Sequence, residues 1–138
     1  MSVTCLIIRR PHRQGPVLWI IDCEQWPRAC LRAELIERGY DPRGFIRVDD
    51  AFDSPSQLLP KPQAVVLELR GQNLTPEGIA KLCGLAVPIV VMGGIIEFND
   101  PLIHEQKWAR ALKRPFSLGS VADLIEQLVP NGLRRRPV

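Results

Sequence analysis

The sequence predicts an α/β protein in which helices cover both faces of a parallel β-sheet. Three observations carry this prediction. Unbroken apolar runs occur at intervals along the chain, segments with helical periodicity lie between them, and proline or glycine marks most of the boundaries. A strand that is buried on both faces needs a continuous apolar run, whereas a half-exposed strand would alternate apolar and polar residues.

The apolar run from Ala64 to Leu67 is the segment around which the prediction is organised. It is bounded by Pro62 and Gly71, and it ends at one carboxylate, Glu68. We expect a central strand that is covered on both faces. Because parallel sheets bind ligands in the crevice at the carboxyl ends of their strands, the surface around Glu68 is the predicted functional site.

The remaining elements follow from the same signals. Further strands are expected at residues 17–21, 44–48, 87–92 and 108–113. Helices are expected at residues 26–38, 54–59, 75–84 and from Ser117 or Ser120 to 129, whereas Pro101 leaves residues 95–107 weakly helical at best. Strands that alternate with helices predict right-handed crossovers and, for five strands, the flavodoxin-like order 2-1-3-4-5. Residues 3–8 could add a further strand in front.

Two of the expected helices carry small or apolar residues at helical spacing, which we expect to face the core. In the first helix these are Trp26, Ala29, Cys30, Ala33 and Ile36. In the helix at residues 75–84 they are Ile79, Leu82 and Cys83. The cysteines are expected to be buried free thiols, because none forms a C-x-x-C pair and no histidine lies near them in the sequence.

Length and composition suit one globular domain without a membrane anchor. The chain has 138 residues, of which 46% are apolar. No stretch approaches the roughly 20 apolar residues of a membrane span. The N-terminus lacks the layout of a signal peptide, so we expect a cytoplasmic protein. The expected organisation is an N-terminal arm or extra strand at residues 1–16, a domain at residues 17–129 and a basic tail at residues 130–138.

Much of the excess positive charge sits at the two ends of the chain. The net charge is +3, and the terminal arginines are Arg9, Arg10, Arg13, Arg134, Arg135 and Arg136. Such tails can contact nucleic acid or an acidic protein surface, although most are solvated termini. No aromatic residues that could stack on bases are interleaved with these arginines. Direct nucleic-acid binding by the terminal arginines is therefore the least favoured of three functional hypotheses.

Three segments occur in an order and spacing typical of one family. Residues 20–24 look like an acidic turn after a first strand, residues 63–69 look like a strand that ends at a phosphorylated aspartate, and residues 112–117 resemble a lysine-proline-phenylalanine motif before a last helix. Over residues 17–129 the chain thus resembles the receiver domain of bacterial two-component response regulators. The resemblance implies a signalling role and phosphoryl transfer to an aspartate with the help of Mg²⁺.

The site residues that the resemblance implies depart from the family pattern at most positions. Glu68 stands at the phosphoacceptor position. The acidic turn consists of Asp22, Cys23 and Glu24, so a thiol replaces the carboxylate expected to contact the metal. The family's hydroxyl position holds Gly93, and its aromatic switch position falls near Ala111. Its lysine position holds Arg114, with Lys113 one residue early. The resemblance is therefore to a degenerate receiver domain.

These residue types favour a site that neither binds Mg²⁺ nor accepts a phosphoryl group. Mg²⁺ requires oxygen ligands, and a thiol is a poor substitute. Glu68 is longer than aspartate and extends to where a phosphoryl group would sit, and we expect it to pair with Arg114 or Lys113. Alternatively, Glu68 is a solvated strand-end residue, or it holds a stray cation together with Asp22. For the glycine pair 93–94, a tight turn is favoured over an anion-binding concavity.

The leading functional hypothesis is a signalling and protein-interaction module that does not depend on phosphorylation and is not an enzyme. It would act through an unidentified protein partner or as a homodimer, and would reach nucleic acid and transcription only through an output partner. The predicted interaction surface consists of Ile96, Phe98, Leu102 and Trp108. The alternative hypothesis is a small-ligand binder or an enzyme that uses the crevice near Asp22, Glu68 and Gly93.

Overall fold

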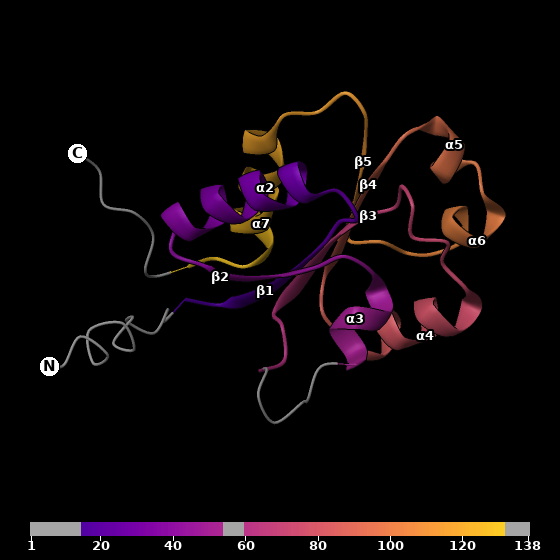
Figure 1. Ribbon diagram of the computed structural model, residues 1–138, viewed down its shortest axis with the longest axis horizontal. Helices are drawn as coiled ribbons and strands as arrows, with labels where there is room; N and C mark the ends of the chain where they lie inside the picture. The colour runs from indigo at the N-terminus through magenta and orange to yellow at the C-terminus, as the bar shows by residue number, and fades with distance from the viewer. Residues whose placement is uncertain (1–14, 54–59, 132–138) are drawn as a thin grey trace, which may run out of the picture.

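A computed structural model, which describes residues 15–53 and 60–131, confirms the predicted α/β architecture (Figure 1). Its parallel sheet has the predicted strand order, β2-β1-β3-β4-β5. The strands are β1 (Val17–Ile21), β2 (Asp41–Phe45), β3 (Ala64–Glu68), β4 (Ile89–Gly93) and β5 (Arg110–Lys113). β3 therefore lies at the centre, as its continuous apolar run predicts, and all of its residues are buried.

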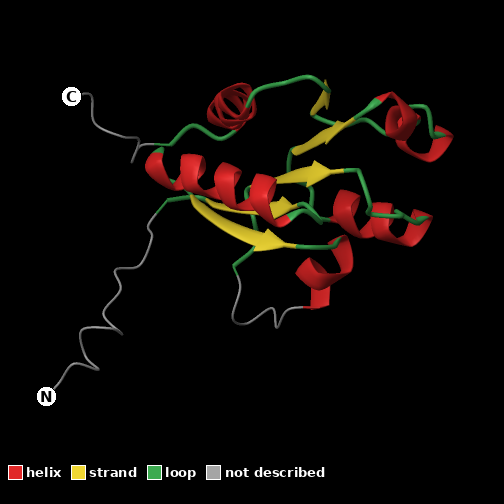
Figure 2. Ribbon diagram, turned by 45° about the horizontal axis from the view of Figure 1, so that its top comes forward, coloured by secondary structure: helices red, strands yellow, loops and turns green. Residues whose placement is uncertain are grey.

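Helices cover both faces of the sheet and give the molecule three layers (Figures 1 and 2). α2 (Gln25–Glu37) and α7 (Leu118–Leu128) lie on one face. α3 (Val48–Asp53), α4 (Pro76–Gly84) and the short helices α5 (Ile95–Phe98) and α6 (Pro101–His104) lie on the other. Alternate residues of β1 divide between the two cores, because successive side chains of a strand point to opposite faces.

Side-chain hydrogen bonds cap the starts of α4 and α7, and a proline begins α6. The Thr75 hydroxyl accepts a hydrogen bond from the Gly78 N–H at 3.1 Å at the start of α4. The Ser117 hydroxyl accepts one from the Ser120 N–H at 3.0 Å, so α7 begins after Ser117 and not at Ser120. Pro101 does not simply interrupt residues 95–107. It occupies the first turn of α6, where the missing N–H of proline costs nothing.

The boundaries of β2 and β5 differ from the prediction. β2 begins at Asp41 instead of Gly44, since Asp41 pairs with Val17 of β1 and its N–H donates to the Pro16 carbonyl at 2.9 Å. Pro42 is tolerated because β2 is an edge strand. The chain then turns directly into α3, and the helix predicted at residues 54–59 lies outside the described residues. β5 begins at Arg110 and is shorter than predicted.

The buried stripe predicted for the first helix is wrong. The residues of α2 that are buried are Leu31 and Leu35, whereas Trp26 is 77% exposed. Ala29, Cys30 and Ala33 are also exposed, and Ile36 is half-buried. The physical reason is that two leucines remove more apolar area from water than alanine or cysteine can. The helical spacing of apolar residues correctly predicts the helix, but it does not predict which face of the helix is buried.

The prediction of buried thiols fails for two of the described cysteines. Cys30 and Cys83 are exposed, and Cys23 is half-buried. The fourth cysteine, Cys5, lies outside the described residues, as do the possible strand at residues 3–8 and the terminal arginines. In the part of the chain that the structure describes, no helix has the length and apolar character needed to cross a bilayer.

Candidate functional site

Glu68 is the last residue of β3 and lies at the carboxyl edge of the sheet, with 2% of its surface exposed. Both of its carboxylate oxygens accept hydrogen bonds from Arg114, Nη1–Oε1 at 2.8 Å and Nη2–Oε2 at 3.0 Å. The main-chain N–H of Arg70 donates to Oε2 as well, at 3.0 Å. The expected pairing with Arg114 is thus confirmed, and the alternative of a solvated carboxylate is wrong.

The strand ladder explains why Arg114, and not Lys113, reaches Glu68. The Arg114 N–H donates to the Gly93 carbonyl at 2.9 Å, which continues the pairing of β5 with β4 by one residue. Neighbouring residues of an extended chain point to opposite sides. The Lys113 ammonium accordingly lies 5.8 Å from the centroid of the Phe98 ring, on the α5 side of the sheet. The pKa of Arg114 is raised, chiefly by its hydrogen bonds to Glu68.

A second set of contacts joins the loop after β1 to the loop after β3. Arg70 Nη2 forms an ion pair with Glu24 Oε1 at 2.8 Å, and the Cys23 thiol donates to the Arg70 carbonyl at 3.3 Å. Gly71 has a φ of 77°, and a Cβ atom at this position would lie 2.7 Å from the Cys23 sulfur. The close approach of the two loops therefore requires glycine here.

Asp22 is buried beside the Glu68 pair, with 3% of its surface exposed. Its Oδ1 accepts a hydrogen bond from the Glu24 N–H at 2.9 Å, and no ion pair joins it to a cation of the described residues. Burial raises the pKa of Asp22, and the charge of Glu68 adds to the effect. The Glu24 N–H and the charge of Arg70 oppose it. The fold therefore compensates the ionised form of Asp22 only in part.

We expect Asp22→Asn to stabilise the protein at pH 7. A raised pKa means that the folded state binds the Asp22 proton more tightly than the unfolded state does. Stability is then lost as the pH rises from the ordinary pKa of 3.8 through the raised value. Asparagine carries no charge and keeps the acceptor for the Glu24 N–H. Thermal melting should show a higher midpoint for the variant at pH 7 and a smaller difference near pH 3.5, with Glu77→Gln on α4 as the control. A lower midpoint at pH 7 would contradict this account.

Gly93 ends β4, and Gly94 follows it in a turn that a carboxylate already occupies. Glu97 Oε1 accepts a hydrogen bond from the Gly94 N–H at 2.7 Å, at the start of α5. This arrangement agrees with the tight turn favoured by the sequence and leaves no room for a second anion at that N–H. Ala111, at the aromatic switch position, is exposed on β5. Positions 93 and 111 thus carry neither a hydroxyl nor an aromatic group that could respond to a change at Glu68.

The predicted interaction surface does not form as expected. Phe98 is 8% exposed and belongs to the core, and Leu102 and Trp108 are half-buried against the same core. The Trp108 indole N–H donates to the Ile103 carbonyl at 3.0 Å. Ile96, at 83% exposed, is the member that remains at the surface. Its neighbour Ile95 is 69% exposed, so the accessible apolar group is this pair at the start of α5.

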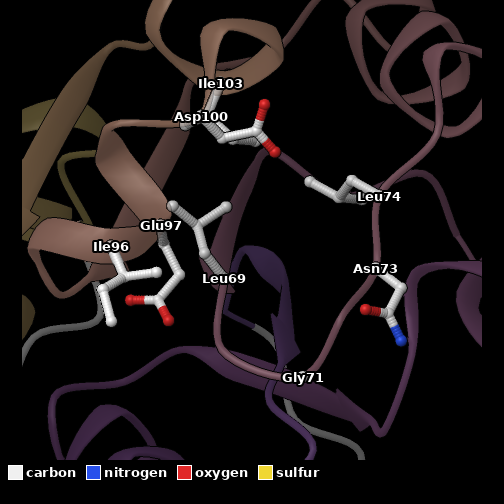
Figure 3. A pocket seen from close by; sticks show the side chains of 8 residues that line it. All are labelled: Leu69, Gly71, Asn73, Leu74, Ile96, Glu97, Asp100 and Ile103. Atoms are coloured by element: carbon white, nitrogen blue, oxygen red, sulfur yellow. The ribbon is translucent and has the colours of Figure 1, made fainter.

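A cavity of about 480 Å³ lies between the loop after β3 and helices α5 and α6 (Figure 3). Its walls include Leu69, Leu74 and Ile103, and its polar groups include Glu97 and Asp100. Both carboxylates already accept a main-chain hydrogen bond, from the Gly94 N–H and the Leu102 N–H. The two acidic side chains of this cavity thus serve as helix caps.

The residues at the Glu68 edge fit Mg²⁺ poorly. Both oxygens of Glu68 are engaged by Arg114, and a guanidinium stands where a cation would bind. The Cys23 thiol is a soft group that is already hydrogen-bonded. Within residues 15–53 and 60–131, no three His, Cys, Asp or Glu side chains converge in a way that could hold a metal ion. The chemistry of this donor set suits a protein ion pair and not a hydrated divalent cation.

Comparisons with known proteins identify the fold. No protein-family profile and no curated protein sequence matches the chain. A response regulator receiver protein from Sinorhizobium medicae superposes with a TM-score of 0.66 at 15% identity, over 83% of this chain and 94% of that one. A CheY-like receiver domain from Methylobacillus flagellatus gives 0.62 at 17% identity, over 82% and 98%.

NtrX from Brucella abortus gives a TM-score of 0.63 at 19% identity, over 82% of this chain and 26% of that one. The chain therefore corresponds in length to about a quarter of that neighbour. The chain has the fold of response-regulator receiver domains. The part of the sequence resemblance that concerns the fold is confirmed.

Proposed function

We propose that this chain is a receiver-fold signalling module whose switch is held by a protein ion pair and does not depend on phosphorylation or Mg²⁺. The observation that carries the proposal is the two-pronged contact of Arg114 with Glu68 at the carboxyl end of the central strand. A planar guanidinium that bonds both oxygens of a buried carboxylate is a strong, geometrically defined interaction. It occupies the position at which a phosphoryl group would be added.

The ion pair supports a module with a fixed state. Glu68 is engaged by three donors, so its carboxylate is poorly placed to attack a phosphodonor. Gly93 supplies no hydroxyl that could follow a change in charge at Glu68. Such a domain would present one surface continuously and would act by binding a protein partner, without being an enzyme. The partner could be a second copy of this chain. Any effect on nucleic acid would be indirect, through an output protein, and we propose that the module acts in the cytoplasm.

The exposed apolar pair Ile95 and Ile96 is the part of the predicted interaction surface that supports protein binding. It lies at the start of α5, close to the edge strand β5, whose Arg110 and Lys113 are exposed. Contiguous exposed apolar side chains can mark a protein-contact site, whereas scattered single ones are common. We propose this corner as the contact region, in place of the four-residue surface expected from the sequence.

Treatment with a small phosphodonor and Mg²⁺, followed by intact mass measurement, tests the proposal. We expect no phosphoryl adduct under conditions in which a phosphorylatable receiver domain, treated in parallel, is modified. Removal of Mg²⁺ with a chelator should leave the melting temperature unchanged. A stable adduct that disappears in Glu68→Gln would overturn the proposal, because it would show that the carboxylate is available as a nucleophile.

A further inference from the structure

A cavity of about 250 Å³ opens beside the Glu68 pair, between the first turns of α2 and α7. Asp22 lines it from the end of β1, and Leu31 and Val121 line it from the two helices. We propose that this cavity binds the ammonium group of a small apolar amine, with Asp22 as the counter-ion. This inference is independent of the proposed function, since it rests on Asp22 and the apolar walls and not on phosphorylation.

Among the described residues that line the cavity, Asp22 is a charged side chain without an ion pair, although the charges of Arg70 and Arg114 act on it from nearby. Arg114 is paired with Glu68, and Arg70 is paired with Glu24 at 2.8 Å. Arg28 Nη1 donates to the main-chain oxygen of Asp22 at 2.7 Å, not to its carboxylate. The carboxylate of Asp22 therefore accepts a single main-chain hydrogen bond and faces the cavity without a cation among the described residues. Buried carboxylates are normally paired, so this one is short of a partner.

The apolar walls of the cavity indicate which body the ligand carries beside its ammonium group. Met92, Phe116 and Val121 contribute apolar surface, and Leu118, which is 39% exposed, stands among the lining residues. A volume of about 250 Å³ is small compared with sites for drug-sized ligands. It suits an amine with a short branched or aromatic body. The charged group would then meet Asp22 while the body replaces water along the apolar walls.

The same lining disfavours the other ligand classes. An anion would approach two carboxylates, Asp22 and Glu68, whereas both arginines are already paired. A hydrated metal ion would have to exchange its water for apolar side chains, which cannot coordinate it. The Nε–H of Arg70 is also buried without an acceptor among the described residues. A water molecule that enters with the amine would satisfy this donor.

Binding can be measured by titrating the ¹⁵N-labelled full chain with isoamylamine and following the amide resonances. We expect shifts that map to the first turns of α2 and α7, and we expect isoamyl alcohol, the neutral isostere, to bind at least about tenfold more weakly. Asp22→Asn should weaken amine binding by a similar factor and leave alcohol binding unchanged. Glu77→Gln on α4 removes the same charge far from the cavity and should have no effect.

A third ligand separates two sources of the same chemistry. If Nα-acetyl-lysine methylamide binds as tightly as isoamylamine, the cavity receives a lysine side chain of a partner protein, and if it binds much more weakly, the ligand is a free amine. Equal affinity for the amine and the alcohol would overturn the assignment of Asp22 as counter-ion. So would an unchanged affinity in Asp22→Asn that gives a folded amide spectrum. Neither outcome bears on whether Glu68 accepts a phosphoryl group.

Discussion

Replacing Arg114 by methionine should lower the free energy of unfolding by about 2–4 kcal/mol. The substitution keeps much of the side-chain length but leaves the Glu68 side chain, which is 3% exposed, with the Arg70 N–H as its one remaining donor among the described residues. Removing one partner of a buried ion pair is more damaging than removing both, because the remaining charge has lost its water and its counter-ion. The Arg114 side chain is 34% exposed, so solvent moderates the loss and keeps it below the upper end for fully buried pairs.

Urea denaturation of three variants at pH 7 distinguishes the contribution of the ion pair to the free energy of unfolding from the contribution of each side chain alone. Arg114→Lys keeps the charge but loses the second hydrogen bond, and we expect a loss between that of the methionine variant and zero. The double variant Glu68→Met with Arg114→Met removes both charges and should recover most of the lost stability. If the double variant is as unstable as Arg114→Met, the unpaired carboxylate is not the cause, and Arg114 acts through its packing on Phe116 instead.

The part of the site that could be predicted is the part fixed by the sheet. The apolar run that ends at Glu68 places this residue at the carboxyl edge of a central strand, and strand order follows from the alternation of strands and helices. Arg114 directly follows the last strand, so the same edge brings it near Glu68. Backbone topology thus brings two residues 46 positions apart into contact, and it can be inferred from local patterns alone.

The remaining contacts depend on which of several side chains occupies a buried position or pairs with a given partner, and local sequence patterns do not determine this. The face of α2 that is buried is decided by Leu31 and Leu35, although Trp26 and its neighbours have the same spacing. The pairing of Arg70 with Glu24 and the unpaired state of Asp22 depend on the path of two loops after their strands. One signal was present in the sequence: Arg70 follows Glu68 by two residues, which places a second cation at the same edge.

Four substitutions that reverse the departures at this edge should create a phosphorylatable site: Cys23→Asp, Glu68→Asp, Gly93→Thr and Arg114→Lys. The shorter carboxylate at position 68 withdraws from the position of the phosphoryl group, and lysine offers a point charge in place of a fork that holds both oxygens. The new carboxylate at position 23 supplies an oxygen ligand for Mg²⁺. A Cβ atom at position 93 would lie 3.3 Å from Leu69 Cδ1 and 3.4 Å from Glu97 Cβ and Oε1, so the threonine requires small shifts of these two side chains.

Mg²⁺ binding and phosphorylation provide separate readouts of this variant. At a Mg²⁺ concentration tenfold above its dissociation constant, the metal should stabilise the variant by about 1.4 kcal/mol and leave the native chain unaffected. Intact mass after treatment with a phosphodonor should then show one added phosphoryl group, and the matched variant that retains Glu68 should show none. If the folded variant binds Mg²⁺ but accepts no phosphoryl group, these four residues are not what prevents phosphorylation. The ion pair of Arg70 with Glu24, which joins the two loops beside position 68, would then be the cause. Adding Arg70→Ala to the four substitutions would then restore the adduct.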